Sequence, residues 1–308
     1  MSAALTIIMF IGGFINSALS YITFQNKESR KIGCGMYLLA SSITSLLTIS
    51  IFTVKFWFLV LTHMKVSMNF SVMLAGCKLI EPILKMFLYL DTWFNACVAI
   101  ERAINVSQGV KFNKTKSKWI ARRVLIILPI CVMGSLIHEP IKRNAFEFKI
   151  ERNETQGNTR ENYIYCITRY SPSLENYNTS ILFFHLIIPF AINLFSALYI
   201  IFGVARQRSN VQRGRTYQEH VQEQFKEHKQ LLISPLVLII LASPRVVIAL
   251  LPGCIDVSKN PWLYLSAYFI SFIPSMLVFI IFVLPSSSYK KKFKESLASW
   301  QQRCCRRR

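Results

Sequence analysis

The chain has 308 residues, 53% of which are hydrophobic, and a formal net charge of +21. Its mean hydropathy is +0.37, and long apolar stretches leave no room for a separate soluble domain. In a soluble protein, an excess of 36 Lys and Arg over 15 Asp and Glu would suggest nucleic-acid binding. Here the position of the basic residues along the chain argues against nucleic acid.

The chain contains seven mostly apolar stretches, each near the length that crosses a bilayer as a helix, about 20 residues. They cover residues 3–24, 36–61, 78–104, 120–138, 180–204, 230–251 and 262–284. The first lacks a basic flank and is longer than the apolar core of a signal peptide, so we expect it to be retained. The sequence predicts an all-α membrane protein with a seven-transmembrane helix bundle over residues 1–285. Residues 286–308 are expected to form a short amphipathic eighth helix and a basic tail.

Basic residues gather on alternate loops of this bundle. They are dense in residues 27–31, 111–123, 206–229 and 290–308, and sparse or balanced by Glu in the loops between. The positive-inside rule therefore predicts a multi-pass protein of the plasma membrane with an extracellular N-terminus and a cytoplasmic C-terminus. The basic charge is then explained by topology and by attraction to membrane lipids, with no role for nucleic acid.

Glycosylation sequons give a second indication of topology. Asn69, Asn153 and Asn178 each begin an Asn-x-Ser/Thr pattern on a predicted outer segment and are candidate glycosylation sites. Asn105 and Asn113 match the same pattern on the inner side, where it would not be used.

Motif searches leave two functional classes open. No catalytic motif and no metal-spaced set of Cys and His occurs in the sequence, so we expect no enzyme activity, no metal and no cofactor. One class is a receptor. The other is a small membrane transporter or channel subunit that uses buried charges as an ion path. Against the second class, the chain has no inverted repeat and no matched pair of broken helices.

Landmarks along the chain favour the receptor. Cys77 opens the third stretch, Glu101-Arg102-Ala103 closes it, and Cys166 lies in the long outer loop. Further landmarks are Asn16, Trp119, Pro189, Pro244 and the amphipathic residues 289–297. Their order and spacing resemble the rhodopsin-like (class A) G-protein-coupled receptors, an orphan and divergent member in this case. The departures are Ala103 in place of tyrosine, Ser45 in place of the second-span aspartate, Leu241-Ala242-Ser243-Pro244 without the family tryptophan, and no clear Asn-Pro-x-x-Tyr motif.

This resemblance implies roles for several residues. It implies a disulfide between Cys77 and Cys166. It also implies that Glu101 holds Arg102 in the inactive state and that Arg102 contacts a heterotrimeric G protein in the active state. Glu223 or Glu227, at the foot of the sixth span, could be a second partner of Arg102. The alternative for Arg102 is an interfacial side chain that reaches lipid phosphate.

Asp91 is expected at mid-membrane depth on the inward face of the third span. We expect it to form a polar cluster with Asn16, Ser45 and Asn95 that holds water or Na⁺. The alternative is a hydrogen-bonded structural aspartate with no ion.

Charged residues also occur in the outer halves of the spans. Lys55, Lys85 and Arg245 with the single acid Glu81 would suit an extracellular ligand that carries a carboxylate, such as a peptide. Leu84 stands where amine receptors keep an aspartate, which disfavours a biogenic amine. The alternative is a structural Glu81–Lys85 pair along one helix. His185 is a further candidate for ligand contact, although such a histidine is more often packed and hydrogen-bonded.

The basic tail contains two neighbouring cysteines. Cys304 and Cys305 follow the amphipathic segment in an Arg-rich context. This pattern predicts palmitoylation and a second membrane anchor. The alternative is two unmodified cysteines.

Overall fold

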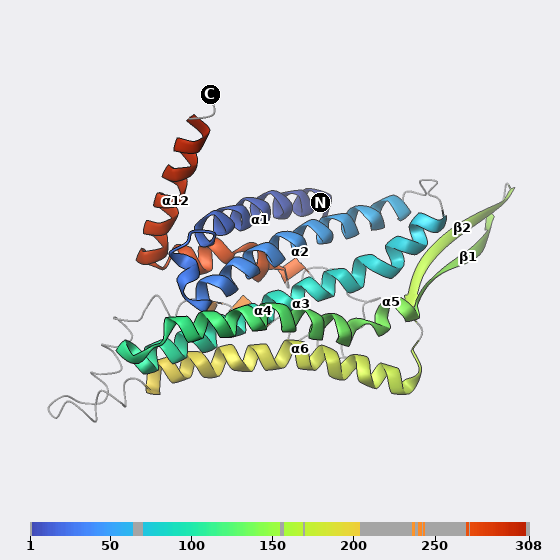
Figure 1. The fold of residues 1–308 in the computed structure, drawn as a ribbon. Coiled ribbons are helices and arrows are strands. Elements are labelled where there is room, and N and C mark those ends of the chain that lie inside the picture. Colours follow the sequence, from blue (N-terminus) through green and yellow to red (C-terminus); the bar gives the residue numbers. More distant parts are fainter. Residues whose placement is uncertain are drawn as a thin grey trace.

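The computed structural model describes residues 2–63, 70–154, 157–168, 170–203, 236–237, 240–241, 243, 269–270 and 272–305. Its long helices lie side by side in one elongated bundle (Figure 1). They are α1 (Ser2–Phe24), α2 (Gly33–His63), α3 (Phe70–Gln108), α4 (Lys114–Leu136) and α6 (Pro172–Leu198). The first five predicted spans each correspond to one of these helices. The sixth span, residues 230–251, falls mostly outside the described residues.

Most helices extend beyond the apolar stretches that predicted them. α2 begins at Gly33 and α3 begins at Phe70, each several residues before the expected start. α4 begins at Lys114 because the Asn113 side chain accepts a hydrogen bond from the Lys116 backbone N–H at 3.0 Å, which is an N-cap. Hydropathy finds the part of a helix that lies in lipid, whereas caps and polar ends decide where it stops.

Within the described residues, four helical stretches are long and apolar enough to cross a membrane by themselves: Ala4–Phe24, Gly33–Phe58, Lys114–Lys142 and Pro172–Leu198. α3 is longer than any of them, but it carries Glu81, Lys85 and Asp91 along its length. Charges in a membrane-spanning helix need partners inside the bundle. α3 packs against α2, α4 and α6, and these neighbours can supply the partners.

The long loop between the fourth and fifth spans contains a β-hairpin that was not predicted from the sequence. After the short α5 (His138–Lys142), β1 (Arg143–Glu154) pairs antiparallel with β2 (Gly157–Thr168), and Phe146 lies opposite Tyr165. The signal was present in the sequence. Apolar and charged residues alternate from Phe146 to Glu151, which is the period of a strand.

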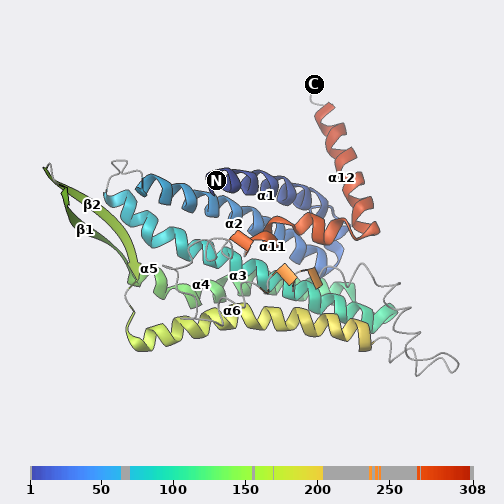
Figure 2. The same ribbon diagram turned by 180° about the vertical axis from the view of Figure 1, so that it is seen from behind.

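The C-terminal part returns to the bundle and then leaves it. α11 (Ile273–Met276) and a π-helical segment (Phe279–Val283) pack against α1, and α11 also packs against α2. α12 (Ser287–Cys305) then runs crosswise to the bundle, at the end opposite to the hairpin (Figures 1 and 2). Phe279 meets Phe293 edge-on, with ring centroids 5.1 Å apart. The expected amphipathic eighth helix is therefore present, and it begins slightly earlier than residue 289.

The core lies between α1, α2, α3, α4 and the seventh span. Its buried residues include Leu38, Leu90, Phe94, Val98 and Phe282. Burying a side chain of this size stabilises a soluble fold by about 1.5–3 kcal/mol. Between membrane helices the gain comes from close packing instead, because lipid is equally apolar.

Candidate functional site

Asp91 lies at the centre of a buried polar cluster between three helical segments. Its carboxylate is 2% exposed. One oxygen accepts hydrogen bonds from Ser41 Oγ at 2.6 Å and Ser45 Oγ at 3.1 Å, and the other accepts from Ser275 Oγ at 2.7 Å. Three hydroxyl donors from α2 and α11 thus offset the loss of water around this carboxylate.

Asn16 and Asn95, which were expected to belong to the same cluster, form no hydrogen bond to Asp91 among the described residues. Asn16 Oδ1 accepts a hydrogen bond from the Phe279 backbone N–H at 2.7 Å, so Asn16 ties α1 to the π-helical segment. In such a segment, some backbone groups lose their usual partners. Asn95 lies one turn beyond Asp91 on α3, and its buried Oδ1 has no hydrogen-bond partner among the described residues. Ser41 and Ser275 were missed from the sequence because serine in a membrane helix is common and carries no pattern of its own.

The charged residues in the half of the bundle nearer the hairpin form two ion pairs between different helices. Lys55 of α2 pairs with Glu81 of α3. Lys85 Nζ lies 2.5 Å from Glu139 Oε1. The alternative of a Glu81–Lys85 pair along α3 is therefore not the arrangement in the structure, because each residue has a partner on another element. Glu139 is one of the Glu residues that balance the basic residues of the long loop in the sequence, and its pairing with Lys85 was not predicted.

Glu139 is shared between two basic side chains. It is 1% exposed and lies at the start of α5, where Arg143 Nη2 approaches its second oxygen at 3.5 Å. Arg143 Nε is buried and has no hydrogen-bond partner in the described part of the chain. Burial, with the Glu139 carboxylate adding to it, raises the pKa of the nearby Tyr170 phenol. The group of Lys85, Glu139 and Arg143 carries one positive charge in excess.

Two other proposed ligand residues are packed into the protein. Both ring nitrogens of His185 are engaged, Nδ1 with Trp93 Nε1 and Nε2 with Ser135 Oγ, each at 2.9 Å, and the ring stacks on Tyr89. Leu84 is buried in a cluster with Phe52, Phe269 and Phe272. Arg245 lies outside the described residues, as do Glu223 and Glu227.

The Glu101 carboxylate joins three helices near the α12 end of the bundle. It accepts a hydrogen bond from Ser117 Oγ of α4 and faces the backbone N–H groups of Gly33 and Cys34 at the start of α2. Gly33 N also donates to Ser117 Oγ at 2.9 Å. A Cβ at Gly33 would lie 2.6 Å from Glu101 Oε2, and also 2.9 Å from Ala121 Cβ and 3.0 Å from the Ser117 carbonyl oxygen, which cannot rotate away, so this approach favours a glycine.

Arg102 is held by contacts other than Glu101. It is 6% exposed, and its guanidinium lies over the Phe282 ring at 5.1 Å. Among the ion pairs of the described residues, none joins Glu101 to Arg102. The Glu101 carboxylate is instead engaged by Ser117 and by the backbone N–H groups at the start of α2, and the hold of Glu101 on Arg102 in an inactive state stays a prediction. Arg102 Nη1 has no hydrogen-bond partner among the residues described.

Tyr289 closes the bundle beneath Arg102. It comes from the first turn of α12, packs edge-on against Phe24 with centroids 5.3 Å apart, and places its hydroxyl 3.8 Å from Cys34 Sγ. Burial raises the pKa of this phenol. The sequence lacks the seventh-span tyrosine of the family, and the structure puts a tyrosine from α12 in contact with the base of the bundle.

The remaining predicted sites are placed only in part. Cys77 is disulfide-bonded. Cys166 lies in β2 opposite Ala145, and Asn153 is near the tip of the hairpin. Asn178 Oδ1 lies 3.2 Å from His138 Nε2. Asn69 is outside the described residues, and Cys304 and Cys305 belong to the last turn of α12. Glycosylation and palmitoylation remain predictions.

The sequence profile described as "7 transmembrane receptor (rhodopsin family)" matches residues 15–305, which is nearly the whole chain. No curated protein matches the chain in sequence. The match spans the second half of α1 and all of α2, α3, α4, α6 and α12. It assigns the chain to signalling through a ligand and a G protein, with no chemistry of its own. The chain therefore belongs to the rhodopsin family of seven-transmembrane receptors.

Proposed function

We propose that this receptor binds an extracellular ligand bearing a carboxylate, such as a peptide, and passes the signal to a heterotrimeric G protein through Arg102. The hairpin end faces outward and α12 lies at the cytoplasmic face of the plasma membrane. This orientation is supported by the Lys-rich start of α12 and the basic start of α4 at one end of the bundle, with Asn153 near the other.

The observation that carries the ligand class is the unpaired charge around Glu139. Lys85 and Arg143 share this one buried acid, and Arg143 Nε lacks a partner among the described residues. An arginine with a free donor is suited to a planar carboxylate, to which it can donate two parallel hydrogen bonds. Lys55 and Glu81 neutralise each other nearby, so the excess positive charge remains with Arg143. Arg245 is a further candidate for the same role.

The outer end of the proposed site is held by the disulfide of Cys77. We assign Cys166 as its partner because β1 packs against α3 and β2 is paired with β1. That link would fix the base of the hairpin beside Arg143, the first residue of β1.

The ligand class is tested by comparing peptide acids with their amides. Cells expressing the receptor are screened with a peptide library against chimeric G-protein reporters, and each active peptide is repeated with its carboxylate amidated. We expect Arg143→Gln to weaken the acid at least about tenfold, because a charge-assisted hydrogen bond contributes about 1.5–3 kcal/mol. Lys142→Gln, which changes the exposed neighbouring charge, is the matched control and should have little effect.

Two results would contradict this proposal. Active ligands whose amides are equally potent on the wild type would remove the carboxylate requirement. Ion flux without any G-protein response would instead favour the transporter or channel alternative.

The Asp91 cluster is proposed to bind Na⁺. A carboxylate surrounded by serine hydroxyls offers oxygen ligands, which hard cations prefer. The unpartnered Oδ1 of Asn95 is one turn away on the same helix and would complete the set. An ion here would favour one arrangement of α2, α3 and the seventh span over others.

Sodium binding is expected to appear as thermal stabilisation. In purified receptor at constant ionic strength, replacing choline chloride by sodium chloride should raise the melting temperature of the wild type by a few degrees. Asp91→Asn should remove this increase, since the amide keeps the shape but not the charge. Ser42→Ala should retain it, because among the described residues the Ser42 hydroxyl donates to its own helix, at the Leu38 carbonyl, and not to Asp91. Equal sodium responses in the wild type and Asp91→Asn would leave a purely structural aspartate.

A further inference from the structure

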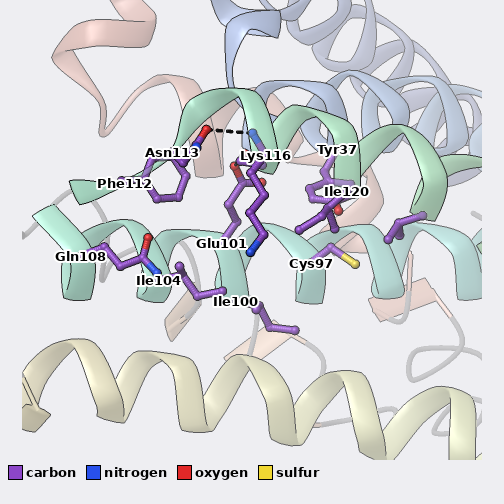
Figure 3. A pocket seen from close by; sticks show the side chains of 12 residues that line it. Tyr37, Cys97, Ile100, Glu101, Ile104, Gln108, Phe112, Asn113, Lys116 and Ile120 are labelled. Atoms are coloured by element: carbon purple, nitrogen blue, oxygen red, sulfur yellow. Dashed lines mark hydrogen bonds between the residues drawn. The ribbon is translucent and has the colours of Figure 1, made fainter. Parts of the chain in front are cut away.

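A cavity of about 390 Å³ lies between α3 and α4, near the α12 end of the bundle (Figure 3). It is separate from the Asp91 cluster and from the charges around Glu139. Such a volume is within the range of ligand pockets, about 300–1,000 Å³. The lining residues come from α2, α3, α4 and the turn between α3 and α4: Tyr37, Cys97, Ile100, Glu101, Ile104, Gln108, Phe112, Asn113, Lys116, Ser117, Ile120 and Val124.

The walls of this cavity are apolar and open to the outside of the bundle. Ile100, Ile104 and Ile120 are 41%, 43% and 43% exposed. All three lie within predicted membrane spans, so we expect their exposed side chains to face lipid tails and not water. The cavity is therefore accessible from the bilayer, and an acyl chain can lie along its isoleucines.

One end of the cavity is positively charged. Figure 3 shows Lys116 extending from the first turn of α4 toward α3, beside Glu101. Glu101 is engaged by Ser117 and the amides of α2. Lys116 is exposed and forms no ion pair within the described part of the chain. The charge available to a ligand here is thus the Lys116 ammonium.

The surroundings of Lys116 indicate the depth of lipid headgroups. The Arg123 guanidinium lies over the Trp119 ring at 3.6 Å, and tryptophan and arginine together are typical of a membrane interface. The first turn of α4 contains no acid, and Lys114 and Lys118 add to its positive charge. The cavity therefore joins an interfacial basic end to an apolar groove within the membrane.

We propose that this cavity binds one anionic phospholipid of the inner leaflet, with its headgroup at Lys116 and an acyl chain along Ile100, Ile104 and Ile120. The choice of leaflet rests on the orientation proposed above, whereas the binding itself does not depend on the extracellular ligand or on G-protein coupling. The lipid would lie against Glu101, next to the arginine proposed for coupling.

Native mass spectrometry of the purified full-length receptor tests the proposal. The delipidated protein is titrated with phosphatidylserine or with phosphatidylcholine of the same acyl chains. We expect the wild type to retain one phosphatidylserine in preference to phosphatidylcholine. Lys116→Gln should weaken phosphatidylserine retention about fivefold, the effect of one basic residue near an anionic membrane surface. Lys114→Gln is the matched control, since Lys114 lies in the same turn but does not line the cavity.

The apolar part is tested by filling it. Ile104→Trp places a large ring in the groove and should weaken retention of either lipid, and Ile100→Trp is the second variant if the first expresses poorly. Equal retention of the two lipids by the wild type would overturn the proposal. So would equal effects of Lys114→Gln and Lys116→Gln, or full retention by the tryptophan variants.

A labelling experiment on the wild type needs no substitution. Cys97 of α3 lines the cavity. Cys131 of α4 is exposed and does not line it. Phosphatidylserine in bicelles should slow alkylation of Cys97 by a membrane-permeant maleimide and leave Cys131 unchanged, as read by peptide mass spectrometry. Protection of Cys97 by added G protein but not by phosphatidylserine would identify the cavity as a protein contact and overturn the lipid assignment.

Discussion

Replacing Arg102 by Ala should abolish G-protein activation while the receptor still reaches the cell surface. The guanidinium is buried over Phe282, and Nη1 has no hydrogen-bond partner among the described residues, so its donors are available to carbonyl groups of an inserted G-protein helix. Losing several charge-assisted hydrogen bonds of about 1.5–3 kcal/mol each should lower nucleotide exchange by more than about tenfold. The measurement is nucleotide exchange on co-expressed G proteins, normalised to surface receptor.

Two further variants make this experiment specific. Arg102→Lys keeps the charge but loses the planar donor fork, and it should retain only part of the activity. Arg123→Ala removes an arginine that stacks on Trp119 at the outer surface of α4, and it should leave exchange close to the wild-type value. If Arg102→Ala signalled normally, Arg102 would be an interfacial residue and the coupling proposal would fail.

Replacing Glu139 by Ala should destabilise the receptor by about 3–5 kcal/mol, the usual effect of removing one partner from a buried ion pair. Glu139 is 1% exposed and Lys85 is 27% exposed. Removing the carboxylate therefore leaves Lys85 and Arg143 without a counter-charge where little water reaches them. The measurement is the thermal or denaturant unfolding of purified receptor, with the loss of surface expression as a second readout.

Double variants separate a paired charge from simple packing. Lys85→Ala combined with Glu139→Ala should be less destabilised than the sum of the two single changes, because the double variant leaves fewer unpaired charges. Glu175→Ala, in the exposed first turn of α6, should change stability by less than about 0.5 kcal/mol. If the effects of Lys85→Ala and Glu139→Ala on the free energy of unfolding were additive, the interaction between the two side chains would contribute nothing to stability.

The bundle could be predicted from the sequence because a bilayer imposes one length on every helix that crosses it. Asp91 was predicted to be buried and paired for a similar reason, since an ionised group in lipid needs a partner. The family pattern of Cys77 and Arg102 gave the receptor class. Each of these inferences depends on the length, composition or motif of a single segment, and not on how separate helices pack together.

The partners of these residues could not be predicted, because they are set by how separate helices meet. Glu101 bonds to Ser117, sixteen positions away along the chain, and no local pattern distinguishes that serine from Ser135 or Ser41. Glu139 looked like one acid among several in the outer loop until α5 placed it against Lys85. The hairpin is different, because the alternation of apolar and charged residues along β1 is enough to predict a strand from the sequence.

The hydrogen bonds of Glu101 have a mechanical consequence. By binding the start of α2 and the side of α4 from α3, this carboxylate locks three neighbouring helices at the base of the bundle, and Gly33 permits no slack between them. We therefore expect α2, α3 and α4 to move little relative to one another when the receptor is activated. Arg102 would then be uncovered by a movement of Phe282 and Tyr289 away from it.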